Sequence, residues 1–255
     1  MDVEAYLERI DYRGDLEPTA ATLSALNRAH LLTVPFENLD IHVNRRIILD
    51  EAALFDKIVT RRRGGFCYEL NGLFAALLRE LGFRVAMLNS LIPEEHNGCG
   101  MDYDHPILLV ELDERWMVDV GFGDAYRVPL KLDQDGEQIG VGAAYLLLPD
   151  RDGRWKFHER LESGGWDFYY AFTLQPCQLS DFAEACHYYE TSPKGFTQKR
   201  ICSRATENGH VSLSEDRLIV TTNGERQEFQ LSGEAEFRRA LLDHFGISLR
   251  MSEKF

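Results

Sequence analysis

Apolar residues in the first third of the chain recur at the three- and four-residue steps of amphipathic helices. One such run extends from Asp2 to Ile10, and a longer one begins at Pro18. A third run follows Asp50, a residue that favours a helix start, and it ends in basic residues and glycines. The intervening residues 35–50 include a proline and β-branched side chains, so we expect an extended segment or a loop there.

A fourth helix is predicted from the stretch RGGFCYELN onward, with Gly82 as its end. Its apolar residues lie on one face. They are Leu70, Leu73, Phe74, Leu77, Leu78 and Leu81. Three residues before Leu70 stands Cys67, which places this thiol in the first turn, on the face directed into the protein.

From Phe83 the pattern changes to short β-rich runs separated by polar turns, which predicts a mostly antiparallel, closed or strongly curved sheet. The runs are 83–92, 105–112, 116–123, 143–149, 154–160 and 166–174. Farther on, Asn223-Gly224 predicts a type I′ hairpin turn. A last helix is expected from Glu234 to Phe245, ending at Gly246. We therefore predict an α+β fold with the helices first.

Length, charge and residue content limit the classes of function that this chain can have. The chain has 255 residues, and no apolar run approaches the roughly 20 residues of a membrane span. The N-terminus lacks a signal peptide's pattern, so we expect a cytoplasmic protein without a membrane partner. The net charge of −14 argues against a nucleic-acid partner. The five cysteines form no CxxC pair, and no two histidines have metal-ligand spacing, so we expect neither disulfides nor a metal.

Cys67 is the first candidate for chemistry. A helix N-terminus carries partial positive charge and unpaired N–H groups, which favour thiolate over thiol. Gly64 and Gly65 would let the backbone approach a ligand and leave donors free for an oxyanion. The alternative is a small buried apolar residue that merely falls in the first turn.

His105 and Asp119 are candidate partners, because each interrupts an otherwise apolar strand. They are opposed in a hairpin centred near Leu112, whereas a turn at residues 113–115 leaves them about 13 Å out of step. We expect a bulge or wider loop that restores contact. Taken singly, each residue has a structural explanation. The histidine could form hydrogen bonds at the end of a strand, and the aspartate could cap a neighbouring loop. Together with Cys67 they form a Cys–His–Asp relay.

Six sequence blocks carry a resemblance to the arylamine N-acetyltransferases along nearly the full length. They are YLERIDYRG, LNRAHLLTVPFENLDI, RRRGGFCYELN, HPILLVEL, WMVDVGFGD and TSPKGFTQKRICSRATENG. The resemblance implies that Cys67, His105 and Asp119 are the catalytic triad. It also implies a helical bundle at 1–83, a β-barrel at 84–190 and an α/β lid at 191–255, with a core similar to cysteine proteases and transglutaminases.

The resemblance further implies an acetyl transfer from acetyl-CoA, through an acetyl-Cys67, to arylamines, hydrazines or N-hydroxyarylamines. Phe122 and Gly123 would wall the pocket, with Phe36 as a weaker candidate. Phe122 and Gly123 are equally compatible with packing and turn roles, and for Phe36 packing is favoured over contact. A pairing of Glu37 with Arg63 would brace the helix that carries Cys67.

One departure from the family is the acidic segment before His105, Met101-Asp102-Tyr103-Asp104, where small or hydroxyl residues are common. Two alternatives to acetyl transfer keep the same triad: a cysteine hydrolase and an amide synthase. A third is a binding protein without catalysis on the same scaffold. The sequence identifies neither the acceptor amine nor the oligomeric state.

Overall fold

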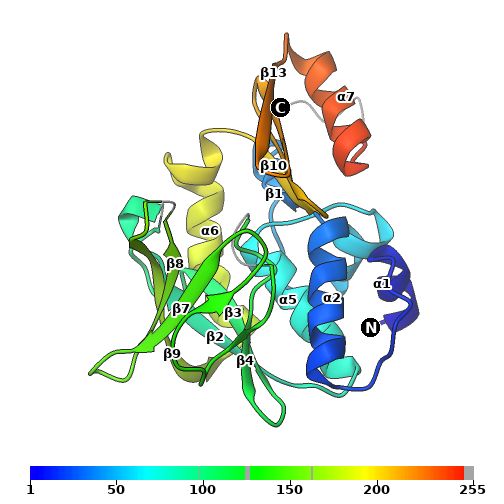
Figure 1. Cartoon of the computed structure of the whole chain (residues 1–255). Coiled ribbons are helices and arrows are strands. Elements are labelled where there is room, and N and C mark those ends of the chain that lie inside the picture. Colours follow the sequence, from blue (N-terminus) through cyan, green and yellow to red (C-terminus); the bar gives the residue numbers. More distant parts are fainter. Residues whose placement is uncertain (97, 124–126, 162, 250–255) are drawn as a thin grey trace.

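The computed structural model describes residues 1–96, 98–123, 127–161 and 163–249. Helices and a nearly closed barrel of strands confirm the α+β prediction. In Figure 1 the barrel, the N-terminal helices and a second sheet covered by helix α7 lie around a common centre. Among the described helices, none is long and apolar enough to cross a membrane.

Four of the five N-terminal helices begin and end close to the predicted positions. Their bounds are α1 (Val3–Arg9), α2 (Ala20–Thr33), α3 (Leu39–His42), α4 (Glu51–Phe55) and α5 (Cys67–Glu80), with a π-type turn η1 (Asp56–Thr60) after α4. Asp50 caps α4 as predicted, because its Oδ1 accepts hydrogen bonds from the N–H groups of Ala52 and Ala53.

Helix α5 is the centre of the molecule. Every residue from 67 to 78 is buried, so this helix is covered on all sides rather than along one stripe. It packs against α1, α4 and the barrel strands β2 and β3. Its side chains join the largest apolar cluster, while a second cluster fills the barrel and a third lies under α7. The first residue of α5 is Cys67, which therefore lies where helices and barrel meet.

The barrel is an eight-stranded antiparallel sheet in the order β5-β4-β3-β2-β9-β8-β7-β6. Its strands are β2 (Arg84–Leu91), β3 (His105–Glu111), β4 (Arg115–Val118), β5 (Leu130–Lys131), β6 (Gln138–Ile139), β7 (Ala144–Pro149), β8 (Trp155–Arg160) and β9 (Trp166–Cys177). The edge strands β5 and β6 are joined through one side chain: Gln138 accepts from the N–H of Lys131 and donates to its carbonyl, at 2.8 Å each.

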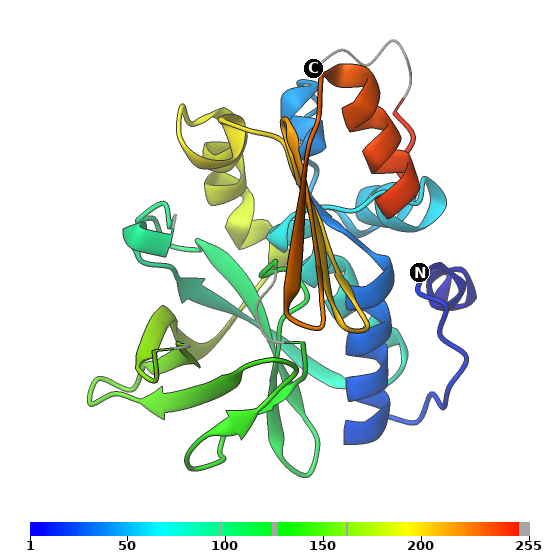
Figure 2. The same ribbon diagram turned by 45° about the horizontal axis from the view of Figure 1, so that its top comes forward.

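The second sheet has the order β1-β10-β11-β12-β13. Its strands are β1 (Phe36–Glu37), β10 (Ile201–Thr206), β11 (Gly209–Ser214), β12 (Arg217–Thr222) and β13 (Glu225–Gln230), and α7 (Glu234–Phe245) packs on it. Figure 2 shows this sheet beside α7. The hairpin turn at Asn223-Gly224 is confirmed, with positive φ at both residues, and α7 ends at Gly246 as predicted.

Several elements were not predicted. The 35–50 segment was expected to be extended or loop, but it contains α3 as well as β1. Helix α6 (Ala183–Thr191) and the one-turn helices η2 (Glu94–His96), η3 (Leu179–Phe182) and η4 (Gly195–Thr197) follow no strong apolar period. The strand expected at 116–123 ends at Val118, so the next five residues form a loop.

Candidate active site

Cys67 is buried, with 6% of its surface exposed, at the first position of α5. The helix start is capped from within, because the Glu69 carboxylate accepts the N–H of Phe66 at 3.1 Å. The role predicted for the preceding glycines is wrong in one respect. The N–H of Gly65 is not left for a ligand but donates to the carbonyl of Pro35 at 3.3 Å. A Cβ on Gly64 would lie 2.0 Å from that same carbonyl oxygen, so glycine is needed there for chain packing.

His105 and Asp119 are in direct contact. The distance between His105 Nε2 and Asp119 Oδ2 is 2.6 Å, and both residues are 2% exposed. The expected bulge is absent, because β3 and β4 pair in unbroken register with Leu108 opposite Val118. In that register Asp119 lies about 7 Å along the strand from the position opposite His105. The chain leaves the strand after Val118, and this departure lets the carboxylate reach the imidazole.

Asn71 is the last residue of the RGGFCYELN stretch, and no role was assigned to it from the sequence. The structure places it at the centre of the site. It lies on α5, one turn after Cys67. Its Nδ2 donates to Asp119 Oδ1 and to the carbonyl of Pro106, each at 2.8 Å, and its Oδ1 accepts the N–H of Val120 at 3.0 Å. The signal was a polar residue on a helix face that is otherwise apolar. Asn71 thus fixes the Asp119 loop to the helix that carries the thiol.

Gly121 brings the same loop against Cys67. A Cβ on this glycine would lie 2.7 Å from Cys67 Cα and 2.8 Å from Asn71 Nδ2, so no larger residue fits. The N–H of Gly121 also donates to Asp119 Oδ1 at 2.8 Å. Asp119 therefore bonds His105 directly and is joined to the Cys67 helix through Asn71 and Gly121.

The electrostatic setting of Cys67 differs from the simple helix-start argument. Burial raises the pKa of the thiol well above its ordinary value, and the carboxylate of Asp119 raises it further. The N–H of Tyr68, one of the first-turn donors, acts in the opposite direction but is outweighed. A sulfur anion here consequently needs a positive charge close to it. His105 is the titratable group in the relay that can supply this charge.

Phe122 lies beside the histidine. Its ring meets that of His105 edge-on, with centroids 5.0 Å apart, and it also contacts Tyr169 and Tyr170 of β9. Gly123 follows with a φ of +61°, a conformation that favours glycine, and a Cβ there would meet no atom within 4 Å. Backbone conformation rather than crowding therefore explains this glycine.

Phe36 lies at another junction. It belongs to β1, where it pairs with Ser203, and its ring centroid is 5.9 Å from that of Phe196. Phe196 is also 5.9 Å from Phe66, the residue before the thiol. Phe36 is thus linked to the start of α5 through Phe196, a residue that was not singled out in the sequence.

The predicted pairing of Glu37 with Arg63 is confirmed, with Arg63 Nη2 2.7 Å from Glu37 Oε1. It belongs to a larger buried cluster. Lys57 Nζ lies 2.9 Å from Asp40 Oδ2 and 2.8 Å from Glu69 Oε1. Burial acts to raise the pKa of Asp40, but Lys57 and Arg63 outweigh it and hold that pKa at about 2. For Glu69, burial prevails over Lys57 and raises the pKa to about 7. The cluster braces the start of α5.

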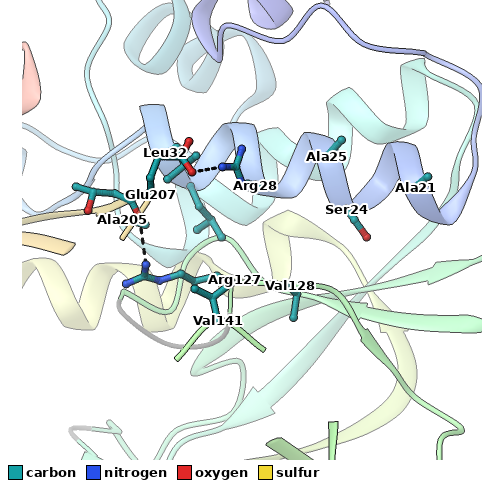
Figure 3. A pocket seen from close by; sticks show the side chains of 12 residues that line it. Ala21, Ser24, Ala25, Arg28, Leu32, Arg127, Val128, Val141, Ala205 and Glu207 are labelled. Carbon is teal, nitrogen blue, oxygen red and sulfur yellow. Dashed lines mark hydrogen bonds and ion pairs between the residues drawn. The ribbon is translucent and has the colours of Figure 1, made fainter. Parts of the chain in front are cut away.

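A separate pocket of about 330 Å³ lies between one face of α2, the barrel and the end of β10 (Figure 3). Arg28 forms an ion pair with Glu207 at its rim, and Arg127 donates to the carbonyl of Thr206 at 3.3 Å. Neither Cys67 nor its two partners line this pocket. Among the described residues, no group of three or more His, Cys, Asp or Glu side chains could hold a metal ion.

Comparison with known proteins gives consistent matches. Residues 19–254 match the family model described as N-acetyltransferase. Human Arylamine N-acetyltransferase 1 is 33% identical over 283 residues, covering 98% of this chain and 95% of that protein. Proansamycin X synthase of Amycolatopsis mediterranei (strain S699) is also 33% identical, over 246 residues that cover 93% and 94% of the two chains. The structure of Mycobacterium marinum arylamine N-acetyltransferase in complex with CoA matches with a TM-score of 0.86 at 30% identity, covering 96% of this chain and 93% of that one.

Proposed function

Because this chain belongs to the arylamine N-acetyltransferase family, a family of acyltransferases, we propose that it moves an acetyl group from acetyl-CoA to an aromatic amine. Hydrazines and N-hydroxyarylamines are included as acceptors. The supporting observation is the bonded series His105–Asp119–Asn71, which ends on the helix that begins with Cys67. The bound CoA in a relative with the same fold supports the acyl donor.

In the first step the Cys67 thiol loses its proton to His105. Asp119 holds Nε2 of the imidazole, so Nδ1 is the nitrogen that faces this task. The thiolate attacks the thioester carbonyl, CoA leaves as its thiol with the proton from the imidazolium, and acetyl-Cys67 remains. Burial and Asp119 both disfavour an isolated thiolate. The nucleophile is therefore one half of an ion pair with the imidazolium.

In the second step an amine attacks the acetyl carbonyl, and His105 accepts the proton that the nitrogen loses. The tetrahedral oxyanion forms at the start of α5, where the partial positive charge of the helix N-terminus stabilises it. Cys67 then leaves as thiolate. The aromatic side chains of Phe122, Tyr169 and Tyr170 give the barrel side an apolar wall. Such a wall limits hydrolysis of the acetyl-enzyme.

The test is a rapid-mixing experiment with acetyl-CoA and no amine. We expect a burst of about one CoA per chain, and intact-protein mass spectrometry should find one added acetyl group at Cys67. Cys67→Ala should give neither signal. Cys202→Ala removes another buried thiol, in the second sheet, and should behave as the unmodified protein does. No burst from the unmodified protein would rule out the scheme.

A second function keeps the same residues. One relative is named as a synthase rather than as an acetyltransferase, although it is as similar as the human enzyme. The chain would then form an amide from another acyl group, or hydrolyse its substrate. An acyl-enzyme at Cys67 with a larger acyl donor, and none with acetyl-CoA, would favour this reading over acetyl transfer.

The location and the division of the chain also belong to the proposal. We place the protein in the cytoplasm, which its five free cysteines support. The division into parts at 1–83, 84–190 and 191–255 assigns the thiol to the first part and its two partners to the second. Limited proteolysis that cut first near residues 83 and 190 would support these boundaries.

A further inference from the structure

Asp104 is a buried carboxylate directly before His105, with 1% of its surface exposed. Its Oδ1 accepts from the Tyr189 hydroxyl at 2.5 Å and from the Cys99 thiol at 3.1 Å. Its Oδ2 accepts from the N–H groups of Cys99 at 3.2 Å and Ile92 at 3.3 Å. None of the ion pairs among the described residues includes it. Burying a carboxylate without a cation costs several kcal/mol unless donors surround it, and here four donors do.

The backbone around Asp104 is shaped to hold this carboxylate. A Cβ on Gly98 would lie 2.9 Å from Asp104 Oδ2 and 1.8 Å from the carbonyl oxygen of Ile92, so only glycine fits. Tyr103 has a φ of 63°, a region that side chains other than glycine adopt at a cost. The described residues of this segment, 92–96 and 98–103, are therefore folded around Asp104, which indicates more than a chance acid in a loop.

Asp104 also connects the two halves of the site. Tyr68 follows Cys67, and its hydroxyl donates to the main-chain carbonyl of Asp104 at 2.6 Å. The residue after the nucleophile is thus bonded to the residue before the base. Tyr189 reaches the side chain of Asp104 from α6, and its ring lies 6.4 Å from that of Tyr68.

We propose that Asp104 is a positioning residue for acyl transfer: held by Tyr189 of α6, it fixes the start of β3 so that His105 faces Cys67, and it adds a second negative charge beside the sulfur. The proposal rests on the role given to Cys67 above.

Titratable groups from several elements lie around Cys67, and Tyr68 and Tyr189 also interact with its thiol electrostatically. Asp119 follows β4, Cys186 lies on α6, Asp104 precedes β3 and His105 begins that strand. The three acidic groups among these raise the pKa of the Cys67 thiol, in addition to burial. Asp104 acts from the β3 side, so neutralising it should stabilise the thiolate and weaken the imidazolium. The pH profile for thiolate reactivity has one limb set by the thiol and one set by the imidazolium. Both limbs should then move to lower pH.

The experiment measures the rate of Cys67 alkylation by iodoacetamide against pH, on the full chain, by peptide mass spectrometry. It needs no acetyl-CoA, so it can succeed or fail independently of the acetyl-transfer proposal. In Asp104→Asn, both limbs should shift down by about one pH unit, the effect expected of one nearby charge. Unshifted limbs in a folded Asp104→Asn protein would overturn the electrostatic part of the proposal.

Tyr189→Phe tests positioning while leaving the carboxylate in place. In this variant both limbs of the pH profile should keep their positions. The plateau rate of alkylation should fall about tenfold, as expected for the loss of one hydrogen bond to a charged acceptor. Tyr188→Phe is the matched control, since the neighbouring tyrosine of α6 makes no bond to Asp104, and it should keep the plateau rate. If Asp104→Asn does not fold, the comparison of Tyr189→Phe with Tyr188→Phe tests the proposal alone. Equal rates in the two tyrosine variants would overturn the proposal.

Discussion

Replacement of Asn71 by alanine tests how the site is held together. The substitution removes three hydrogen bonds and leaves the Pro106 carbonyl and the Val120 N–H buried without this partner. The bond to the Asp119 carboxylate should be worth about 2 kcal/mol and the two neutral bonds about 1 kcal/mol each. We therefore expect the free energy of unfolding to fall by about 4 kcal/mol, a large share of the roughly 5–15 kcal/mol typical of a domain.

The same change should lower kcat more than it raises KM for the amine. Asp119 would keep Gly121 and His105 as partners, but the loop would lose its bond to the Cys67 helix. Urea unfolding gives the stability, and steady-state acetylation gives kcat and KM, measured where the variant is folded. Asn71→Asp provides a second test, because it places another carboxylate against Asp119 and should reduce kcat further.

Asn27 offers a matched control. It is also a buried asparagine on a helix, but its side chain makes one hydrogen bond with the described residues, from its Nδ2 to the carbonyl of Arg127 at 3.1 Å, outside the triad. Asn27→Ala should cost about 1 kcal/mol and leave kcat nearly unchanged. Equal losses in the two alanine variants, or a loss below about 1 kcal/mol for Asn71→Ala, would refute the reasoning.

Three further predictions follow from buried groups. Lys57→Met should lower the free energy of unfolding by about 3–5 kcal/mol, because Glu69 loses its cation, and a denaturation midpoint equal to that of the parent would contradict this. Burial lowers the pKa of His30 to about 3, so below pH 6.5 the unfolded chain binds a proton that the folded one does not. Stability should thus fall by about 1.4 kcal/mol per pH unit between about pH 6 and pH 3, and His30→Gln should show a flatter slope in urea titrations; equal slopes would argue against the assignment. Gly121→Ala should cost about 1–3 kcal/mol and slow acetylation of Cys67, since its Cβ would lie 2.7 Å from Cys67 Cα; an unchanged rate would show that the loop can move aside.

Local signals in the sequence predicted much of the fold. Asp50 caps α4, Asn223-Gly224 turns a hairpin and Gly246 ends α7, because each feature depends on residues a few positions apart. Helix α6 was missed because its contacts are long-range: Tyr189 bonds Asp104, a residue 85 positions away in the chain. The entry of β1 into the second sheet depends on the pairing of Phe36 with Ser203, a still larger separation along the chain, and left no local pattern.

The site was predictable to the extent that its residues were unusual where they stood. Cys67 followed from the apolar period of α5, and the even spacing of His105 and Asp119 placed them on one face. The bulge was a wrong inference, because the turn position alone does not show that the strand ends at Val118. Asn71 was visible as a polar residue on a buried face, but its partner comes from another part of the chain.

The central claim is that the sulfur of Cys67 is an anion only because His105 carries the compensating proton. The direct measurement is the thiolate absorbance of the resting protein at neutral pH, corrected with Cys67→Ala and compared with His105→Asn. The proposed mechanism predicts a thiolate signal in the parent and its loss in His105→Asn, since burial and Asp119 would then raise the pKa of the thiol without a compensating charge. A protonated sulfur in the parent protein, or a thiolate that survives without the imidazole, would contradict the claim.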